Sequence, residues 1–146
     1  MTVHLPSSIH AGAHRYEVRV YYEDTDAGGV VYHANYLRFA ERARTEALRA
    51  LGVPHAEMES QHGLIFMVRR GKLDYLAPAR LDDLILVATE VVAIRGASVS
   101  LRQTVWRDGK LLVEIGLDLA CLRAADQRPH RIPPRWRDAL MSMISP

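Results

Sequence analysis

The chain has 146 residues, of which 49% are hydrophobic and 25% are charged. This length and composition suit one folded domain with a packed core, and they exclude a disordered chain. The formal net charge of +2 argues against a nucleic-acid-binding surface as the main function.

The cysteine content and the N-terminal residues indicate a compartment. Cys121 is the only cysteine, so no internal disulfide can form and a reducing environment is expected. The opening residues, MTVHLPSSIHAGAH, lack the apolar segment of a signal peptide. No apolar run approaches the roughly 20 residues that cross a bilayer. The sequence therefore predicts a cytoplasmic protein with no stable membrane insertion.

The first predicted element is a strand that begins at His14. Residues 1–13 are small and polar, and we expect a loose tail there. From His14 onward the apolar positions alternate with charged ones, as in a strand with one buried side. The positions on the apolar side are Tyr16, Val18, Val20 and Tyr22.

A long helix is predicted from about His33 to Leu51, where the apolar period changes. Gly52 and Pro54 follow it as stop signals. The apolar side of this helix is rich in alanine, so another element can approach it closely, as a curved sheet closed around the helix would. The positions on that side are Tyr36, Ala40, Ala43, Ala47 and Leu51.

Strand-like segments follow at residues 64–75, 84–94, 99–105 and 111–121. The segment 84–94 is apolar on both faces, which is typical of a central strand covered on two sides. Asp108 and Gly109 predict a tight hairpin turn before the last strand.

The chain ends in an amphipathic segment behind Pro133 and Pro134, where we expect a short helix over 133–144. Core packing or an oligomer contact is favoured over a membrane surface for it, because it is short. One long helix and about five strands predict an α+β domain spanning residues 1–146, with an antiparallel sheet wrapped around a single central helix.

The acidic turn (residues 23–29, EDTDAGG) connects the first strand to the long helix. A calcium loop needs more oxygen ligands at fixed spacing, and its twelfth position, counted from Asp24, is Asn35 instead of Glu. No metal site is therefore expected. The Gly28-Gly29 pair matches no phosphate-binding glycine motif.

A plain solvated turn is one open interpretation, because Asp and Gly are common turn formers. The turn, however, directly precedes the only long helix. Backbone N–H groups at a helix N-terminus are unpaired, and the helix dipole is positive there. A carboxylate beside such an electrophilic end is suited to the hydrolysis of acyl groups.

The segment YYEDTDAGGVVYHANYLRFAERARTEALR resembles the signature region of the hotdog-fold acyl-CoA thioesterases. It is especially similar to the branch encoded beside the Tol–Pal envelope genes, a relative of the hydroxybenzoyl-CoA thioesterases. The resemblance continues through YLAPARLDD and RGAS and covers the chain from Tyr16 to about Leu122.

This resemblance implies a hotdog fold and a homodimer or homotetramer with active sites at subunit interfaces. It implies hydrolysis of acyl-CoA, and it leaves acyl-carrier protein open as a second thioester carrier. No cofactor is expected, because coenzyme A is part of the substrate.

The resemblance also assigns residues. Asp26 matches the catalytic carboxylate, as nucleophile or general base, and Asp24 is expected to hold the turn. The backbone N–H near His33 would polarise the thioester carbonyl, and the His33 imidazole is a second catalytic candidate. The expected substrate contacts are Gly28, Gly29, Tyr32, Asn35, Arg95 and Ser98.

Two further expectations concern binding surfaces. The phosphates of coenzyme A need a basic cluster, either at Arg95 and Ser98 or at Arg69, Arg70 and Lys72. Tyr22 is expected in the core, with the substrate pocket as the alternative.

Two other functions stay open. A hotdog dehydratase would use a His with a carboxylate on hydroxyacyl thioesters and would release no thiol. A non-catalytic module would bind acyl thioesters or acyl-carrier protein in envelope maintenance. The D-T-D turn ahead of the helix favours the thioesterase.

Overall fold

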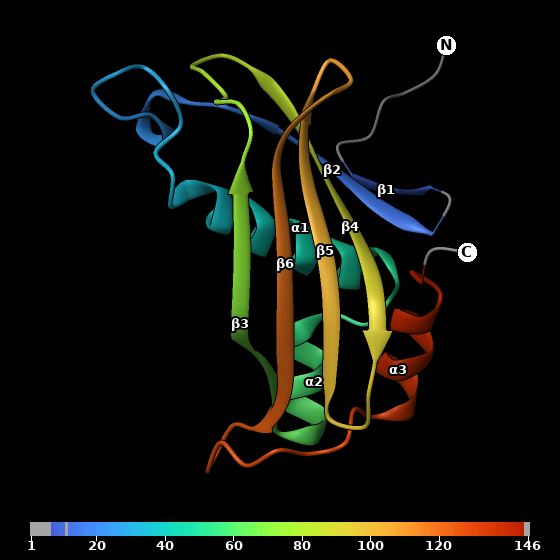
Figure 1. The fold of residues 1–146 in the computed structure, drawn as a ribbon. Helices are drawn as coiled ribbons and strands as arrows, with labels where there is room; N and C mark the ends of the chain where they lie inside the picture. Colours follow the sequence, from blue (N-terminus) through green and yellow to red (C-terminus); the bar gives the residue numbers. More distant parts are fainter. Residues whose placement is uncertain (1–6, 11, 145–146) are drawn as a thin grey trace.

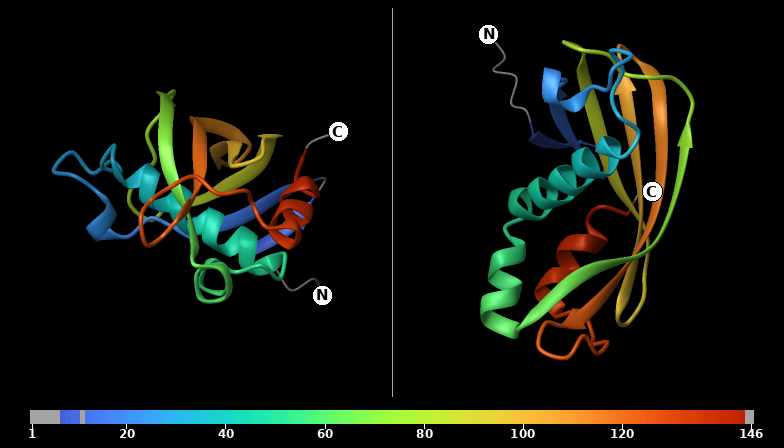
Figure 2. Two further views of the ribbon diagram at one scale, coloured as in Figure 1. Left: turned by 90° about the horizontal axis from the view of Figure 1, so that it is seen from below. Right: turned by 90° about the vertical axis from the view of Figure 1, so that its left-hand side faces the viewer.

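The computed structural model describes residues 7–10 and 12–144. They form a six-stranded antiparallel sheet in the order β1-β2-β4-β5-β6-β3, with the helices on one face (Figures 1 and 2). The strands are β1 (Ser7–His10), β2 (Ala13–Arg19), β3 (Leu64–Tyr75), β4 (Leu84–Ile94), β5 (Ser98–Arg107) and β6 (Lys110–Arg123). The helices are η1 (Tyr22–Asp24), α1 (Asn35–Ala50), α2 (His55–His62) and α3 (Pro134–Met141).

The predicted α+β hotdog arrangement is confirmed, because the sheet curves around α1 (Figure 2). Helix α1 packs against β1, β2 and β4 through its small side chains. Ala40 and Ala43 are fully buried and Ala47 nearly so, which lets the strands approach the helix axis closely. The larger Tyr36 and Phe39 fill the space between α1 and the sheet.

The N-terminal residues differ from the expected loose tail. Ser7–His10 form β1, which pairs antiparallel with β2 through contacts such as Ser7 opposite Tyr16. Gly12, with a φ of 79°, provides the left-handed residue in the turn that joins these strands. Backbone pairing across this short turn is possible for polar residues that show no apolar period. The remaining residues of the expected tail, 1–6 and 11, lie outside the described residues.

Two further features differ from the sequence predictions. Helix α2 was not predicted, because Met58 is its only buried residue and one buried position produces no helical period.

The prediction that β4 is covered on both sides is wrong for the single chain. Ile85 and Val87 are buried, but Val92 on the other face is 60% exposed. Apolar composition on both faces therefore did not indicate burial on both faces.

The C-terminal part of the chain packs into the core, as predicted. Trp136, Leu140 and Met143 are buried, and the amide of Val91 in β4 donates to the carbonyl of Met143 at 3.0 Å. The predicted hairpin is also confirmed, since Asp108 and Gly109 have φ values of 50° and 78°, as a tight β-hairpin turn requires. Within the described residues, no helix is long and apolar enough to cross a bilayer.

Candidate functional site

The acidic turn begins in η1, which ends the first long strand earlier than its alternation suggested. Tyr22 was expected in the core or a pocket, but it opens η1 and is 81% exposed. The Asp24 carboxylate accepts a hydrogen bond of 2.8 Å from the Tyr21 amide, which draws the backbone out of the extended conformation. The strand therefore ends at Arg19, before the period of two is exhausted.

Asp24 holds the two ends of the connection together. Its side chain binds the Tyr21 amide, while its carbonyl accepts hydrogen bonds from the Tyr32 amide at 3.0 Å and the Asn35 side chain at 2.9 Å. Asn35 was expected to contact substrate, but its amide group is buried against the turn. This geometry favours a structural role for both side chains.

Asp26 is exposed at the tip of the turn. Its Oδ1 accepts a hydrogen bond of 2.8 Å from the Gly28 amide, and its own amide donates to the Val30 carbonyl at 2.9 Å. Its second carboxylate oxygen has no hydrogen-bond partner within the described part of the chain. One oxygen thus fixes the orientation of the carboxylate, while the other can attack a carbonyl or accept a proton.

The glycine pair fits the turn for two different reasons. A Cβ atom added to Gly28 would lie 3.3 Å from Asp26 Oδ1, closer than an ordinary contact. Gly29 has a φ of 76°, which other residues adopt only with strain. A side chain at either position would therefore disturb the Asp26 carboxylate or the backbone that carries it.

The N-terminus of α1 provides backbone donors in the same short connection as this carboxylate. Ala34 is the N-cap residue, and no side chain caps the helix. In residues 7–10 and 12–144, the amides of His33 and Ala34 have no hydrogen-bond acceptor. Unpaired amides at the positive end of a helix dipole can polarise a carbonyl oxygen. Asp26 and the expected polarising group thus lie in one short connection.

The side chains of Tyr32 and His33 are exposed in this connection. Their rings lie 4.4 Å apart, and the His33 carbonyl accepts a hydrogen bond of 3.0 Å from the Tyr75 hydroxyl. Tyr75 belongs to β3, so this bond ties the end of the edge strand to the candidate site.

A support loop (residues 76–83) holds the acidic turn from behind. The Val31 amide donates to the Ala79 carbonyl at 2.8 Å, and the Ala79 amide donates to the Tyr36 hydroxyl at 3.0 Å. Val30 and Arg80 form an antiparallel bridge. The sequence segment YLAPARLDD therefore positions the candidate site, although periodicity alone did not indicate this.

Asp83 anchors the support loop to the sheet. Its carboxylate accepts hydrogen bonds from Arg107 at 2.7 Å and from the Arg80 amide at 2.8 Å. Burial opposes ionisation, but these two hydrogen bonds and the positive charges of Arg107 and Arg80 together outweigh it and hold the pKa of Asp83 below its usual range. The anchor is therefore fully formed above the ordinary pKa of a carboxyl group and is lost as the pH falls through the lowered one.

The two basic candidates lie in different parts of the sheet. Arg95 and Ser98 occupy the β4–β5 turn, at the opposite end of the sheet from the acidic turn (Figure 1). The Arg95 guanidinium donates to the Ser100 hydroxyl at 2.8 Å. The other cluster, Arg69, Arg70 and Lys72, is exposed on β3. Arg95 and Ser98 are therefore too distant to serve the acidic turn of their own chain.

Within the part of the chain that the structure describes, no three His, Cys, Asp or Glu side chains gather closely enough to hold a metal ion. Asp24 and Asp26 each accept a hydrogen bond from a backbone amide instead, as described above.

Comparison with known proteins places this geometry in a family. The model of the thioesterase superfamily matches residues 28–114. The acyl-CoA thioesterase YbgC of Haemophilus influenzae is 44% identical over 124 residues, which cover 85% of this chain and 91% of that protein. The acyl-CoA thioester hydrolase YbgC of Escherichia coli O6:H1 is 42% identical over 82% of this chain and 89% of its own length.

Solved structures agree with these matches. A probable thioesterase from Bartonella henselae superposes with a TM-score of 0.79 at 34% identity, covering 83% of this chain and 99% of its own. A hypothetical protein from Thermus thermophilus superposes with a TM-score of 0.82 at 31% identity, covering 88% of this chain and 98% of its own.

Proposed function

The chain belongs to the thioesterase superfamily, and on this premise we propose that it is an acyl-CoA thioesterase in which Asp26 supplies the catalytic carboxylate. One observation carries the assignment. An exposed carboxylate, oriented through one oxygen by the Gly28 amide, lies in the same short connection as the unpaired amides of His33 and Ala34. Acyl transfer to water needs a nucleophile or base that acts on the carbonyl carbon or on the water, and donors that stabilise the charge on the carbonyl oxygen.

The reaction follows from this arrangement. The thioester oxygen accepts hydrogen bonds from the amides at the start of α1, which stabilise the charge that develops on it. The free Asp26 oxygen either attacks the carbonyl carbon, giving a mixed anhydride that water then hydrolyses, or removes a proton from the attacking water. Coenzyme A leaves as its thiolate, and the acyl group leaves as a free acid. The His33 imidazole is exposed beside the turn, where it can assist the leaving thiolate.

The edge strand β3 supplies the reason for an oligomer. It ends the sheet, and it carries exposed apolar side chains such as Met67 and Val68. A two-fold axis pairs two identical edges antiparallel, so the Tyr75 end of one β3 lies beside the Leu64 end of the partner strand. The Tyr75 hydroxyl is hydrogen-bonded to the His33 carbonyl, so the acidic turn lies near the Tyr75 end of β3. In such a dimer the acidic turn of one protomer would therefore face α1, α2 and β3 of its partner.

We therefore expect a dimer or a tetramer of such dimers in solution. Val68→Lys, which places a charge on the paired edge, should give monomers and lower turnover at least tenfold, because the site loses its facing protomer. Val92→Lys is the matched control on an exposed position of β4. Sedimentation velocity and thiol-release rates test both variants. A wild-type monomer with full activity would refute the shared site.

Three finer assignments belong to the same proposal. Membership of the Tol–Pal-associated branch, related to the hydroxybenzoyl-CoA thioesterases, rests on the motif from Tyr21 to Arg49. A cytoplasmic location suits both an acyl-CoA substrate and the single free Cys121. Acyl-carrier protein is a second carrier, to be tested beside coenzyme A with the same acyl group.

A further inference from the structure

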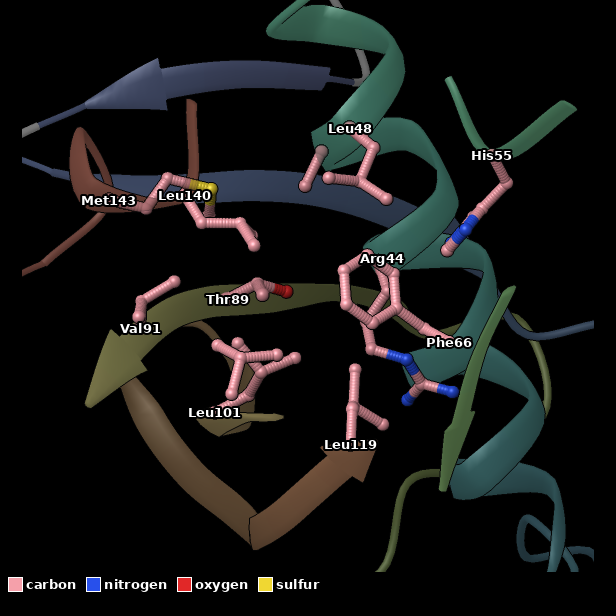
Figure 3. A pocket seen from close by; sticks show the side chains of 12 residues that line it. Arg44, Leu48, His55, Phe66, Thr89, Val91, Leu101, Leu119, Leu140 and Met143 are labelled. Carbon is pink, nitrogen blue, oxygen red and sulfur yellow. The ribbon is translucent and has the colours of Figure 1, made fainter. Parts of the chain in front are cut away.

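Two hollows lie next to each other between α1 and the sheet. The outer groove has a volume of about 450 Å³ and lies between α1, α2 and β3, with Glu41, Glu59 and Val68 among its lining residues. The inner cavity has a volume of about 20 Å³ and is lined by apolar side chains such as Leu48 and Leu101 (Figure 3).

The two hollows share one wall. Arg44, His55, Phe66 and Leu119 line both of them. Figure 3 shows the side chains of Arg44 and Phe66 together on the side of the inner cavity next to β3. A ligand that entered the outer groove would therefore meet this wall before it reached the core.

Arg44 is the charged group of that wall, and it has few partners. Its Nη1 donates to Gln103 Oε1 at 3.0 Å. Among the described residues this is its only hydrogen bond, and no carboxylate lies within ion-pair distance of it. A guanidinium has five N–H donors, so most of those on Arg44 remain for water or a ligand.

Gln103 cannot turn away from Arg44. Its side-chain nitrogen donates to the Ala40 carbonyl and to Thr89 Oγ1, both at 2.9 Å, which fixes the amide with its oxygen toward the guanidinium. The buried polar chain from Thr89 through Gln103 thus holds Arg44 at the wall of the groove. Such a network rigidifies the groups that it connects.

The surroundings of Arg44 define which ligand group it can accept. Burial lowers the pKa of Arg44, and Glu41 opposes this effect. Burial and the Arg44 charge both lower the pKa of His55, so no second cation strengthens the wall at neutral pH. Glu41 and Glu59 line the outer groove and disfavour a negatively charged ligand there. A neutral oxygen acceptor satisfies the guanidinium without meeting this repulsion.

We propose that Arg44 is a specificity-determining residue that selects acyl groups carrying a hydroxyl or keto oxygen at their far end over plain alkyl chains. The inference rests on the proposed function. In the proposed two-fold dimer the acidic turn of one protomer would face the outer groove of its partner, so the acyl chain of a bound thioester would extend toward the partner's Arg44. An alkyl end at the wall would bury the N–H donors of Arg44 without hydrogen-bond acceptors. A hydroxyl or keto oxygen would instead accept hydrogen bonds from them.

The test compares pairs of CoA thioesters of equal chain length, one ending in a methyl group and one in a hydroxyl group, over a series of lengths. We expect the wild-type protein to hydrolyse the hydroxyl-ended member with at least tenfold higher kcat/KM at the length that reaches Arg44. Arg44→Met keeps an unbranched apolar stem without the donors and should reverse the preference. Arg44→Lys should retain it, and Arg49→Met, an exposed arginine of the same helix, should leave it unchanged.

Equal rates for both members at every length in the wild-type protein would overturn the proposal, even if Arg44→Met fails to fold. An unchanged preference in a folded Arg44→Met variant would overturn it as well. Absence of thiol release from every thioester would instead refute the proposed function on which the inference rests, so the two failures are distinguishable.

Discussion

Asp26→Asn is expected to lower turnover about a hundredfold or more, the scale for loss of a positioned base, and further if Asp26 is the nucleophile. The substitution keeps the size of the side chain and its acceptor for the Gly28 amide, but it removes the charge. Because Asp26 is exposed and packs against no core residue, folding and acyl-CoA binding should stay close to wild type. Steady-state thiol release and thermal melting measure the two effects separately.

Asp24→Asn is the matched control two positions earlier. Asp24 accepts a hydrogen bond from the Tyr21 amide and closes the turn through its backbone carbonyl, and Asn keeps both acceptors, so the substitution should reduce stability by at most about 1 kcal/mol. Its effect on turnover should be much smaller than that of Asp26→Asn. If Asp24→Asn is the inactive variant, or if Asp26→Asn hydrolyses acyl-CoA at the wild-type rate, the roles within the acidic turn are assigned wrongly.

Trp136→Ala is expected to destabilise the fold by about 3–5 kcal/mol, the range for removal of a large buried ring. The Trp136 side chain is fully enclosed, its Nε1 donates to the Val53 carbonyl at 3.1 Å, and its ring meets that of His62 edge-on at 5.3 Å. The ring therefore joins α3 to α2 and to the connection behind α1. The change leaves a cavity and also an unpaired carbonyl.

Chemical denaturation of Trp136→Ala and of a control variant measures this effect. Met141→Ala is suitable, because Met141 lies in the same helix and is 54% exposed, so a change within about 0.5 kcal/mol is expected for it. A loss below about 1 kcal/mol for Trp136→Ala would show that α3 is not part of the cooperative core.

The apolar patterns predicted the longest elements of the fold. The strands β3 and β4 have the bounds that the sequence predicted, and α1 differs by one or two residues at each end. Periodicity did not reveal α2, which buries Met58 alone, or β1, which is held by backbone pairing. Periodicity also predicted that the first strand continues to Tyr22. The hydrogen bond from the Tyr21 amide to the Asp24 side chain ends the strand earlier, and such a bond leaves no pattern in the sequence.

The candidate site was predictable where it is local in the chain. Asp26, the glycine pair and the helix start lie within one short connection, and the motif resemblance distinguished Asp26 from Asp24. The groups that hold this connection are distant, since the Ala79 amide and the Tyr36 hydroxyl are 43 positions apart. Arg44 was overlooked because it lies between the apolar and charged sides of α1, and only its bond to Gln103, 59 positions away, reveals its direction.

The central claim is that this chain hydrolyses acyl-CoA through its own side chains and backbone. The most direct test is to follow free thiol and free acid released from a saturated acyl-CoA by the wild-type protein, before and after exhaustive chelation. We predict equal amounts of thiol and acid, at a rate that chelation does not change. Acyl-CoA recovered intact, or a rate lost with chelator and restored by one divalent ion, would contradict this account.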